Sequence, residues 1–248
     1  MNAKTTDGQR NWDREKRAEL LSTASPFRSL APALLDEVAG LLRPDRYVRG
    51  EFVLAEGLPA SRFHVLGEGR VKVMRGDEEG REVILRLIGP GDIFGSDGLW
   101  GGEAYELSAL AVQDSVVLRM LVGKAAALME AHPEFAAALV REFGRRLRED
   151  DERILDLQTA RAQARIARML LRVADQMGVD GEGGRELGIR LTRRDLAEMA
   201  GVTEGTVSRS LSGWERRGIV EAGRERVAIL LRDELQAAAE DAPLEEDG

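Results

Sequence analysis

The segment of residues 191–220, LTRRDLAEMAGVTEGTVSRSLSGWERRGIV, restricts the fold of this chain more than any other feature. Thr192, with Asp195 three residues later, matches a helix N-cap of the capping-box type. Gly201 then predicts a tight turn, because glycine adopts the left-handed backbone conformation without a steric penalty. Thr203 can cap a second helix directly after that turn. Two short helices joined in this way predict a helix-turn-helix.

The second of these helices presents polar and basic side chains at its N-terminal end. An arginine can bond both acceptors of a guanine in the major groove, and a glutamate can accept from a cytosine amino group. Hydroxyls and further arginines suit phosphates, and residues 219–229 read as strand, glycine turn and strand, which adds a wing. We therefore expect base contacts from Arg209 and Glu204. Phosphate contacts are expected from Thr192, Arg193, Thr203, Thr206, Arg224 and Arg226.

The distribution of charge removes an objection to DNA as a partner. The formal net charge of the chain is −8, which is unusual for a nucleic-acid binder. Residues 161–232, however, contain 14 basic and 10 acidic residues, whereas residues 233–248 contain 7 acidic and no basic ones. The mildly positive net charge of residues 161–232 is thus masked in the total by the acidic C-terminal tail and by an acidic N-terminal part.

The first half of the chain has a different sequence pattern. Between residues 46 and 121, short apolar runs alternate with glycine-containing turns about every 8 to 12 residues, which is typical of an all-β sandwich or barrel. Residues 29–43 have apolar side chains at helical spacing, and residues 178–188 are polar and glycine-rich, which predicts a surface loop. None of the glycines forms a dinucleotide-binding or Walker-type motif.

A long helix is predicted between these two regions. Residues 134–159 contain no proline and one glycine, and their apolar residues recur at alternating spacings of four and three. This pattern favours a two-stranded coiled coil, although a helix packed on its own domain can also show it. Asp150 interrupts the pattern. The predicted dimer seam consists of Val140, Phe143, Leu147, Ile154 and Leu157.

Composition excludes several classes of protein. The chain has no cysteine and two histidines, so disulfides, thiolate metal sites and multi-histidine centres are excluded. No set of nucleophile, base and orienting group is visible, and we expect neither an enzyme, nor a metal, nor a cofactor. No stretch approaches the roughly 18 apolar residues of a membrane helix. The first 26 residues are polar and contain no apolar run like that of a signal peptide, so we expect a cytoplasmic protein without a membrane partner.

The predicted β-rich region, long helix and winged helix-turn-helix follow one another along the chain in this order. In this arrangement the chain resembles the Crp/Fnr family of the cyclic-AMP receptor protein and the fumarate–nitrate reduction regulator. The most specific motifs are GEGRVKVMRGDEEGREVILRLIGPGDIFG and TRRDLAEMAGVTEGTVSR. The resemblance implies an α+β fold with an N-terminal β-roll (a cyclic-nucleotide-binding-like jelly roll), a long dimerisation helix and a C-terminal winged helix-turn-helix. It also implies a homodimer on near-palindromic double-stranded DNA, with RNA polymerase as a further partner and a small-molecule effector in the roll.

The expected divisions of the chain follow from the same reading. They are a polar N-terminal extension at 1–26, a β-roll sensor domain at 27–132, a dimerisation helix at 133–160, a winged helix-turn-helix domain at 161–232 and an acidic tail at 233–248.

The pocket that the resemblance implies departs from the cyclic-AMP pattern. In that pattern a glutamate binds the ribose and an Arg-Ser pair neutralises the phosphate, whereas here Ser96 and Leu107 stand in the places of the glutamate and the arginine. Asp150 and Asp151 fall where the family has its adenine-binding Thr and Ser. We therefore expect an effector other than cyclic AMP, or none. The candidate pocket residues are Gly95, Ser96, Gly98, Leu99, Leu107, Ser108, Asp150 and Asp151.

The DNA reader departs from the family as well. In the cyclic-AMP receptor pattern an Arg, a Glu and a later Arg read bases, and their places hold Glu204, Gly205 and Arg209. The fumarate–nitrate type has a Ser before that later Arg, which Ser208 and Arg209 match. The resemblance therefore carries base reading over to Arg209 most directly, and to Glu204 and Ser208 as further candidates.

The alternative class is a regulatory module that binds a small molecule, or haem through His64 or His132, and acts on a protein partner. A structural role is the simpler interpretation for each histidine, because His64 lies in a strand pattern and His132 precedes a proline.

Overall fold

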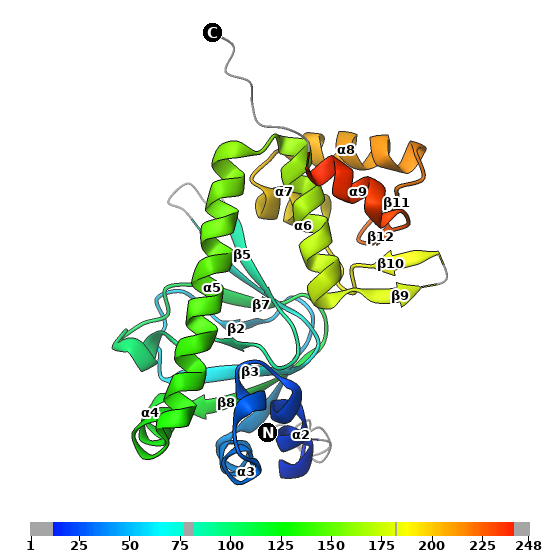
Figure 1. The fold of residues 1–248 in the computed structure, drawn as a ribbon. Coiled ribbons are helices and arrows are strands. Elements are labelled where there is room, and N and C mark those ends of the chain that lie inside the picture. The colour runs from blue at the N-terminus through cyan, green and yellow to red at the C-terminus, as the bar shows by residue number, and fades with distance from the viewer. Residues whose placement is uncertain (1–11, 77–81, 182, 241–248) are drawn as a thin grey trace. The chain divides into compact units, whose positions relative to one another are not determined.

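The computed structural model describes residues 12–76, 82–181 and 183–240. The fold is α+β, as the sequence predicts, with an N-terminal β domain, a long helix and a C-terminal helix-turn-helix with a small β wing (Figure 1). The chain forms two compact units that divide between Arg146 and Leu147, except that residues 82–84 group with the second unit.

Two antiparallel sheets of four strands form the β-roll of the N-terminal unit. One has the order β1-β8-β3-β6 and the other β2-β7-β4-β5, and Figure 1 shows β3 and β8 in one layer and β2 and β7 in the other. The strands turn apolar side chains inward, and Leu66, Phe94 and Val117 belong to a cluster of buried residues there. The strands are β1 (Arg43–Tyr47), β2 (Phe52–Leu54), β3 (Arg62–Glu68), β4 (Val71–Gly76), β5 (Glu82–Ile88), β6 (Ile93–Phe94), β7 (Ser108–Ala111) and β8 (Ser115–Leu121).

Helices cover one side of the roll. A second buried cluster contains Leu21, Phe27, Val38 and Phe135 from these helices together with Phe63 from β3. The helical elements of the unit are α2 (Arg14–Thr23), η1 (Phe27–Ser29), α3 (Pro32–Leu41), η2 (Asp97–Trp100), α4 (Val122–Ala131) and the start of α5 (Pro133–Thr159).

The N-terminal extension is more ordered than its polar composition suggests. Asp13 caps α2 by accepting from the backbone N–H of Lys16 at 2.9 Å, and Trp12 and Leu21 are buried. The Arg17 guanidinium donates to the backbone carbonyls of Asp13 and Leu42. Residues 12–26 are therefore part of the N-terminal unit, because two large apolar side chains and one arginine attach them to its core.

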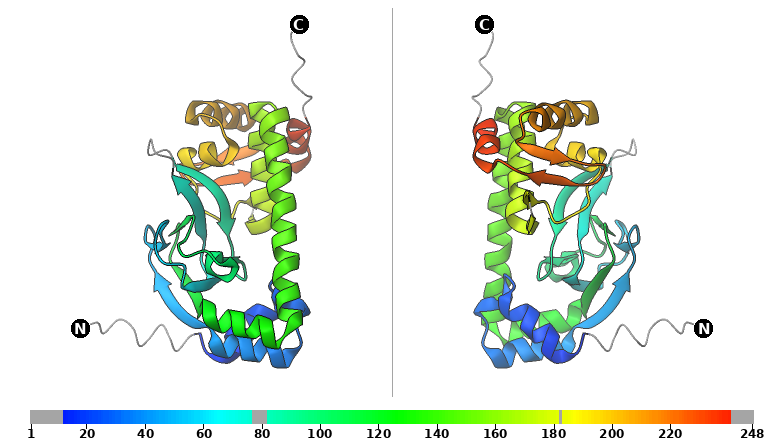
Figure 2. Two further views of the ribbon diagram at one scale, coloured as in Figure 1. Left: turned by 90° about the vertical axis from the view of Figure 1, so that its left-hand side faces the viewer. Right: turned by 90° about the vertical axis from the view of Figure 1, so that its right-hand side faces the viewer.

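The predicted long helix is confirmed. It is α5, which starts at a proline in its first turn and continues for 27 residues to Thr159. Figure 2 shows it from two sides as one continuous helix. Its second half, from Leu147, belongs to the C-terminal unit.

The C-terminal unit contains the predicted helix-turn-helix and wing. Its sheet has the order β11-β12-β10-β9, so the wing strands are extended by a hairpin within residues 178–188. The prediction of a loop for that segment is wrong, because Arg185 and Glu186 on β10 pair with Ile229 and Ala228 on β12, far along the chain. The elements are α6 (Ala162–Met177), β9 (Val179–Gly181), β10 (Gly184–Glu186), α7 (Arg193–Ala200), α8 (Glu204–Arg216), β11 (Val220–Ala222), β12 (Val227–Ile229) and α9 (Arg232–Ala239).

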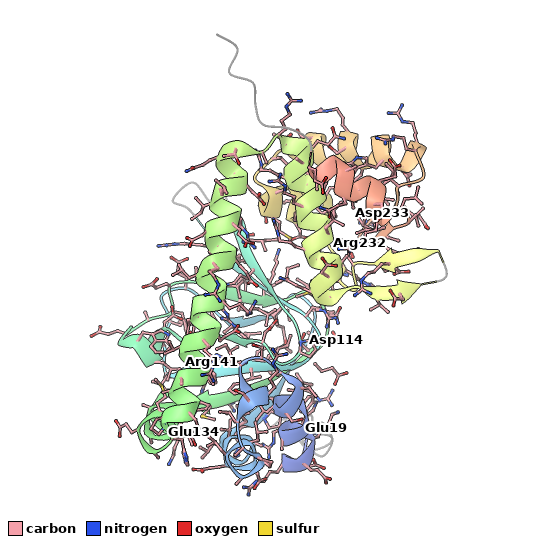
Figure 3. The ribbon with its side chains drawn as sticks, viewed as in Figure 1. Glu19, Asp114, Glu134, Arg141, Arg232 and Asp233 are labelled. Carbon is pink, nitrogen blue, oxygen red and sulfur yellow. The ribbon has the colours of Figure 1, made fainter. Side chains whose placement is uncertain are left out.

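Helix α9 occupies the first part of the segment that the sequence sets apart as an acidic tail. Leu235 and Ala239 on this helix are buried. Arg232, which Figure 3 labels beside Asp233, forms an ion pair with Asp175 of α6 at 2.8 Å. This part of the segment is thus a folded element of the C-terminal unit, and residues 241–248 of the predicted tail lie outside the described residues.

Candidate nucleic-acid interface and effector cavity

The first helix of the helix-turn-helix is fixed by a capping box. The Thr192 hydroxyl accepts from the backbone N–H of Asp195 at 3.1 Å, and the Asp195 carboxylate accepts from the backbone N–H of Thr192 at 2.8 Å. After α7, Gly201 has φ +63, and a Cβ there would lie 2.7 Å from a methyl group of Leu157. A glycine is therefore required by both the backbone conformation and the packing.

The N-terminal end of α8 presents the predicted base-reading residues. Thr203 caps the helix by accepting from the backbone N–H of Thr206 at 3.2 Å, and Arg209 donates from Nη2 to the Thr206 hydroxyl, also at 3.2 Å. Glu204, Ser208 and Arg209 are exposed. The opposite face of the helix holds the buried residues Val207, Leu211 and Trp214.

The predicted phosphate contacts fall into different environments. Arg193 is partly covered, burial lowers its pKa, and its Nη1 atom is buried with no hydrogen-bond partner among the described residues. In the wing, Arg224 is exposed, whereas Arg226 pairs with Glu186 at 2.6 Å and with Glu221 at 3.4 Å. Of the wing arginines, Arg224 is thus the better placed to meet a phosphate.

One residue that sequence reasoning missed supports the helix-turn-helix from α6. The Arg165 guanidinium donates to the carbonyl oxygens of Ala200 at 3.1 Å and Gly201 at 3.0 Å, at the end of α7. It also donates to the carbonyl oxygen of Ala160, between α5 and α6, at 2.9 Å. Because those carbonyls lie at helix ends and have no partner within a helix, Arg165 satisfies them and holds the turn in place.

A cavity of about 70 Å³ lies in the N-terminal unit, at the place where the resemblance implies an effector. Of the predicted pocket residues, Gly95, Ser96 and Leu107 line it. Leu99 packs on the buried core of the helical side, and the Ser108 hydroxyl accepts from the backbone N–H of Glu56 at 3.0 Å. Gly98, Leu99 and Ser108 are not in the lining among the described residues, and on α5 the lining ends at Arg146, before Asp150 and Asp151.

Two arginines in the cavity wall were not predicted. Arg86 of β5 and Arg146 of α5 both line it. Arg146 donates from Nε to the Glu142 carboxylate and from Nη2 to the carbonyl oxygen of Ile93, each at 2.8 Å. Arg145 also donates to the Glu142 carboxylate, at 2.6 and 3.0 Å. Sequence alone gives no signal for this cluster, because Arg146 and Ile93 are distant along the chain.

The buried carboxylate at the centre of the cluster remains ionised. Burial alone would raise the pKa of Glu142, but the hydrogen bonds and charges of Arg145 and Arg146 leave it below its ordinary value. The Ser25 hydroxyl, in the segment after α2, donates to the same carboxylate at 3.2 Å. Glu142 thereby connects α5, the N-terminal segment and, through Arg146, strand β6.

Both histidines have protein partners. His64 is 3% exposed, stacks on Phe94 with ring centroids 5.2 Å apart, and has a pKa lowered to about 3, chiefly by burial. His132 lies 3.1 Å from Glu37 and 3.7 Å from Glu134. In the described part of the chain, no group of three or more His, Cys, Asp or Glu residues is placed to hold a metal ion.

The predicted dimer seam is largely uncovered in the single chain. Val140 and Leu147 are each 63% exposed and Ile154 is 54% exposed, and Leu157 is exposed as well. Phe143 differs, because its ring packs edge-on against Trp100 with centroids 4.9 Å apart.

Among the described helices, none is long and apolar enough to cross a membrane.

Comparisons with known proteins match both units. The family described as "Cyclic nucleotide-binding domain" matches residues 44–132, and "Crp-like helix-turn-helix domain" matches residues 164–238. The "CRP-like cAMP-activated global transcriptional regulator" of Mycobacterium tuberculosis is 28% identical, with 85% of this chain and 94% of that protein covered. The "Cyclic AMP receptor protein" of Thermus thermophilus is 30% identical over 203 residues, which cover 82% of this chain and 91% of that protein.

A solved structure agrees in fold. A transcriptional regulator of the CRP family from Thermus thermophilus has a TM-score of 0.69 and 29% sequence identity, covering 80% of this chain and 97% of that chain. A β-roll of the cyclic-nucleotide-binding type, a long helix and a winged helix-turn-helix define a DNA-binding transcriptional regulator. The chain belongs to the Crp/Fnr family, as its sequence motifs indicate. Regulators of this family are non-enzymatic and bind DNA, typically as dimers, with small-molecule effectors.

Proposed function

We propose that this chain is a cytoplasmic homodimer that binds a near-palindromic DNA site in a sequence-specific way and regulates transcription together with RNA polymerase. The observation that carries the proposal is the N-terminal end of α8, where Arg209 is exposed and oriented by Thr206. Arg209 reads a guanine in each half-site, and Glu204 and Ser208 contact neighbouring bases. Thr192, Arg193, Thr203, Thr206 and Arg224 contact phosphates; Arg226 joins them only by leaving its two carboxylate partners.

Selection of bound duplexes from a random pool, with purified protein and no added ligand, tests this proposal. We expect a near-palindrome bound with a Kd in the range of about 10⁻⁸–10⁻¹¹ M and a steep dependence on salt. Arg209→Ala should cost about 1–3 kcal/mol and relax the preference at one base pair of each half-site. Arg216→Ala, at the other end of the same helix, is the matched control and should keep that preference. Absence of any preferred duplex would favour a regulatory module that acts on a protein partner.

The exposed seam on α5 supports the homodimer. Burying side chains such as Val140, Leu147 and Ile154 against a second copy would remove from water an apolar stripe that only Asp150 interrupts. Leu147→Glu should therefore yield monomers in sedimentation and weaken DNA binding. Leu155→Glu is the matched control, because Leu155 is equally exposed on the same helix but lies outside the seam. An unchanged dimer in the Leu147→Glu variant would refute the seam.

The effector in this proposal is not cyclic AMP, although relatives are named for it. Ser96 and Leu107 line the cavity in place of the ribose-binding carboxylate and the phosphate-binding cation. The two arginines of the cavity wall, Arg86 and Arg146, already interact with other groups of the protein, so a phosphate would have to compete for them, and an uncompensated phosphate is costly to bury. Calorimetry should detect no binding of cyclic AMP at micromolar concentration, and micromolar affinity would contradict this part of the proposal.

A further inference from the structure

The end of α5 that carries the last two seam residues belongs to the same compact unit as the helix-turn-helix. Ile154 and Leu157 are 54% and 47% exposed and lie on the face that the proposed homodimer buries. A two-fold dimer places its two DNA-reading helices symmetrically about the seam, and the distance between them must match the separation of the half-sites. The contacts between the end of α5 and α8 therefore decide whether this unit alone can set that separation.

A carboxylate ties the last turn of α5 to α6. Asp156 accepts from Arg168 at 2.5 Å and from Arg172 at 2.8 Å, and both arginines lie on α6. The Asp156 side chain is 14% exposed, so these ion pairs are screened less than pairs in open solvent. Ala160, in the bend between the two helices, is buried. The junction of α5 and α6 is thus held in one arrangement.

The turn of the helix-turn-helix rests on the same end of α5. A methyl group of Leu157 lies 2.7 Å from the position that a Cβ of residue 201 would take, so Leu157 packs directly on Gly201. About half of the Leu157 side chain nevertheless remains exposed. This leucine therefore has one side against the turn and another side available to a second copy.

Arg165 of α6 connects the junction to the turn through one guanidinium. Its Nη1 atom donates to the carbonyl oxygen of Ala160, whereas Nε and Nη2 donate to those of Ala200 and Gly201. The donors of a planar guanidinium point in fixed directions, so the turn cannot rotate against the junction without breaking at least one of these bonds. Helix α8 begins at Glu204, directly after the turn, and its orientation follows that of the turn.

We propose that Arg165 is a positioning residue for DNA binding. Through Ala160 and Gly201 it fixes α8 relative to the dimer seam, and it thereby sets the separation of half-sites that the homodimer accepts. Arg165 acts through the turn and not by contact with DNA. This inference rests on the proposed function, because it takes the chain as a DNA-binding homodimer.

Pulsed electron paramagnetic resonance on the full chain without DNA measures the positioning directly. The chain has no cysteine, so Ser212→Cys, at an exposed position of α8, gives one site for a nitroxide label in each protomer. We expect a narrow distribution of the distance between the two labels, and a broader one when Arg165→Gln is added. Arg161→Gln is the matched control, because it removes the same charge from an exposed residue at the start of α6 and should leave the distribution narrow.

Duplexes with the selected half-sites at different separations give the functional readout. One added base pair moves a half-site by about 3.4 Å along the duplex and by about 35° around it. The parent chain should therefore lose at least about tenfold in affinity for such a duplex. Arg165→Gln should lose most of this discrimination and keep its affinity for a single half-site, because Arg209 is unchanged. Arg165→Lys keeps the charge but has its donors on one nitrogen, so it should behave like Arg165→Gln and replaces that variant if it does not fold.

Three results would overturn the proposal. They are a broad distance distribution in the parent dimer, a parent-like distribution and spacing preference in both Arg165 variants, and a loss of single-half-site binding in both variants, which would make Arg165 merely structural. Absence of coupling between the labels in the parent chain would show a monomer and would refute the homodimer of the proposed function together with this inference. A coupled dimer with unchanged Arg165 variants would refute this inference alone.

Discussion

The buried imidazole of His64 should make the N-terminal unit sensitive to mild acid. Its pKa is lowered from 6.5 to about 3 in the folded chain, chiefly by burial and then by the nearby charges of Arg62 and Arg119. In the unfolded chain His64 is therefore protonated as the pH falls below about 6.5, whereas in the folded chain it stays neutral until the pH approaches about 3. Stability is complete above pH 6.5 and falls as the pH drops through that value, since protonation favours the unfolded state.

The size of this effect follows from the two pKa values. Each pH unit between them changes the free energy of unfolding by about 1.4 kcal/mol. Acidification from pH 6.5 to 5 should therefore remove about 2 kcal/mol from the stability of the roll. Burial raises the pKa of Asp92, so protonation of this carboxyl group acts in the opposite direction, and a variant without the histidine is needed to isolate the contribution of His64.

Hydrogen exchange of the backbone amides in β3 and β8, measured at pH 7 and pH 5, reports this loss. His64→Gln has a similar volume and no titration, so its roll should lose much less stability on acidification. The Nδ1 atom of His64 has no hydrogen-bond partner among the described residues, which limits the cost of the replacement at pH 7. His132→Gln removes the other imidazole and should retain the acid loss. If His64→Gln loses the same amount, about 2 kcal/mol, as the parent chain, His64 is not the source and this reasoning fails.

Three further substitutions test the contacts described above. Glu142→Gln leaves the buried guanidinium of Arg146 without its carboxylate and should destabilise the N-terminal unit by about 3 kcal/mol in urea unfolding; an effect below about 1 kcal/mol would mean that other groups balance the charge. Gly201→Ala forces a side chain into a left-handed conformation and toward Leu157, so it should cost at least about 1–2 kcal/mol in thermal unfolding. Asp156→Asn weakens two partly exposed ion pairs with arginines of α6 and should cost about 1–2 kcal/mol, most of it lost in high salt if the pairs are the cause.

The parts of the fold that sequence predicted are those specified by neighbouring residues. A capping box spans four residues, a left-handed turn needs one glycine at the right place, and a helix repeats its apolar residues every three or four positions. The helix-turn-helix, the wing strands and α5 were predicted because these signals are local. The roll was recognised in the same way, from turns at regular spacing.

The parts that escaped prediction depend on contacts between distant residues. The hairpin of β9 and β10 reads as a polar loop until Glu186 pairs with Ala228. Helix α2 is polar along most of its length, and its place is fixed by the buried side chains of Trp12 and Leu21, with Ala18 and Leu20 packed against the same cluster. In the cavity, Ser96 and Leu107 were predicted from their places in the family pattern. Arg146 was not predicted, because its partner Ile93 is distant along the chain.

Arginine explains much of this difference between local and distant order. The chain has 32 arginines and 4 lysines, a ratio that composition alone does not connect to any site. Several of these guanidiniums donate hydrogen bonds to backbone carbonyls far along the chain: Arg146 to Ile93, Arg165 to Ala200, and Arg168 to Ala239. A guanidinium can do this because its five N–H donors point in fixed directions, so one side chain can satisfy two or three carbonyls at once. A lysine has its three donors on a single nitrogen and would leave most of those carbonyls without a partner. Charge counts treat the two residues alike, which is why the charge of residues 161–232 was compatible with a nucleic-acid partner but gave no information about the carbonyls that these arginines bind.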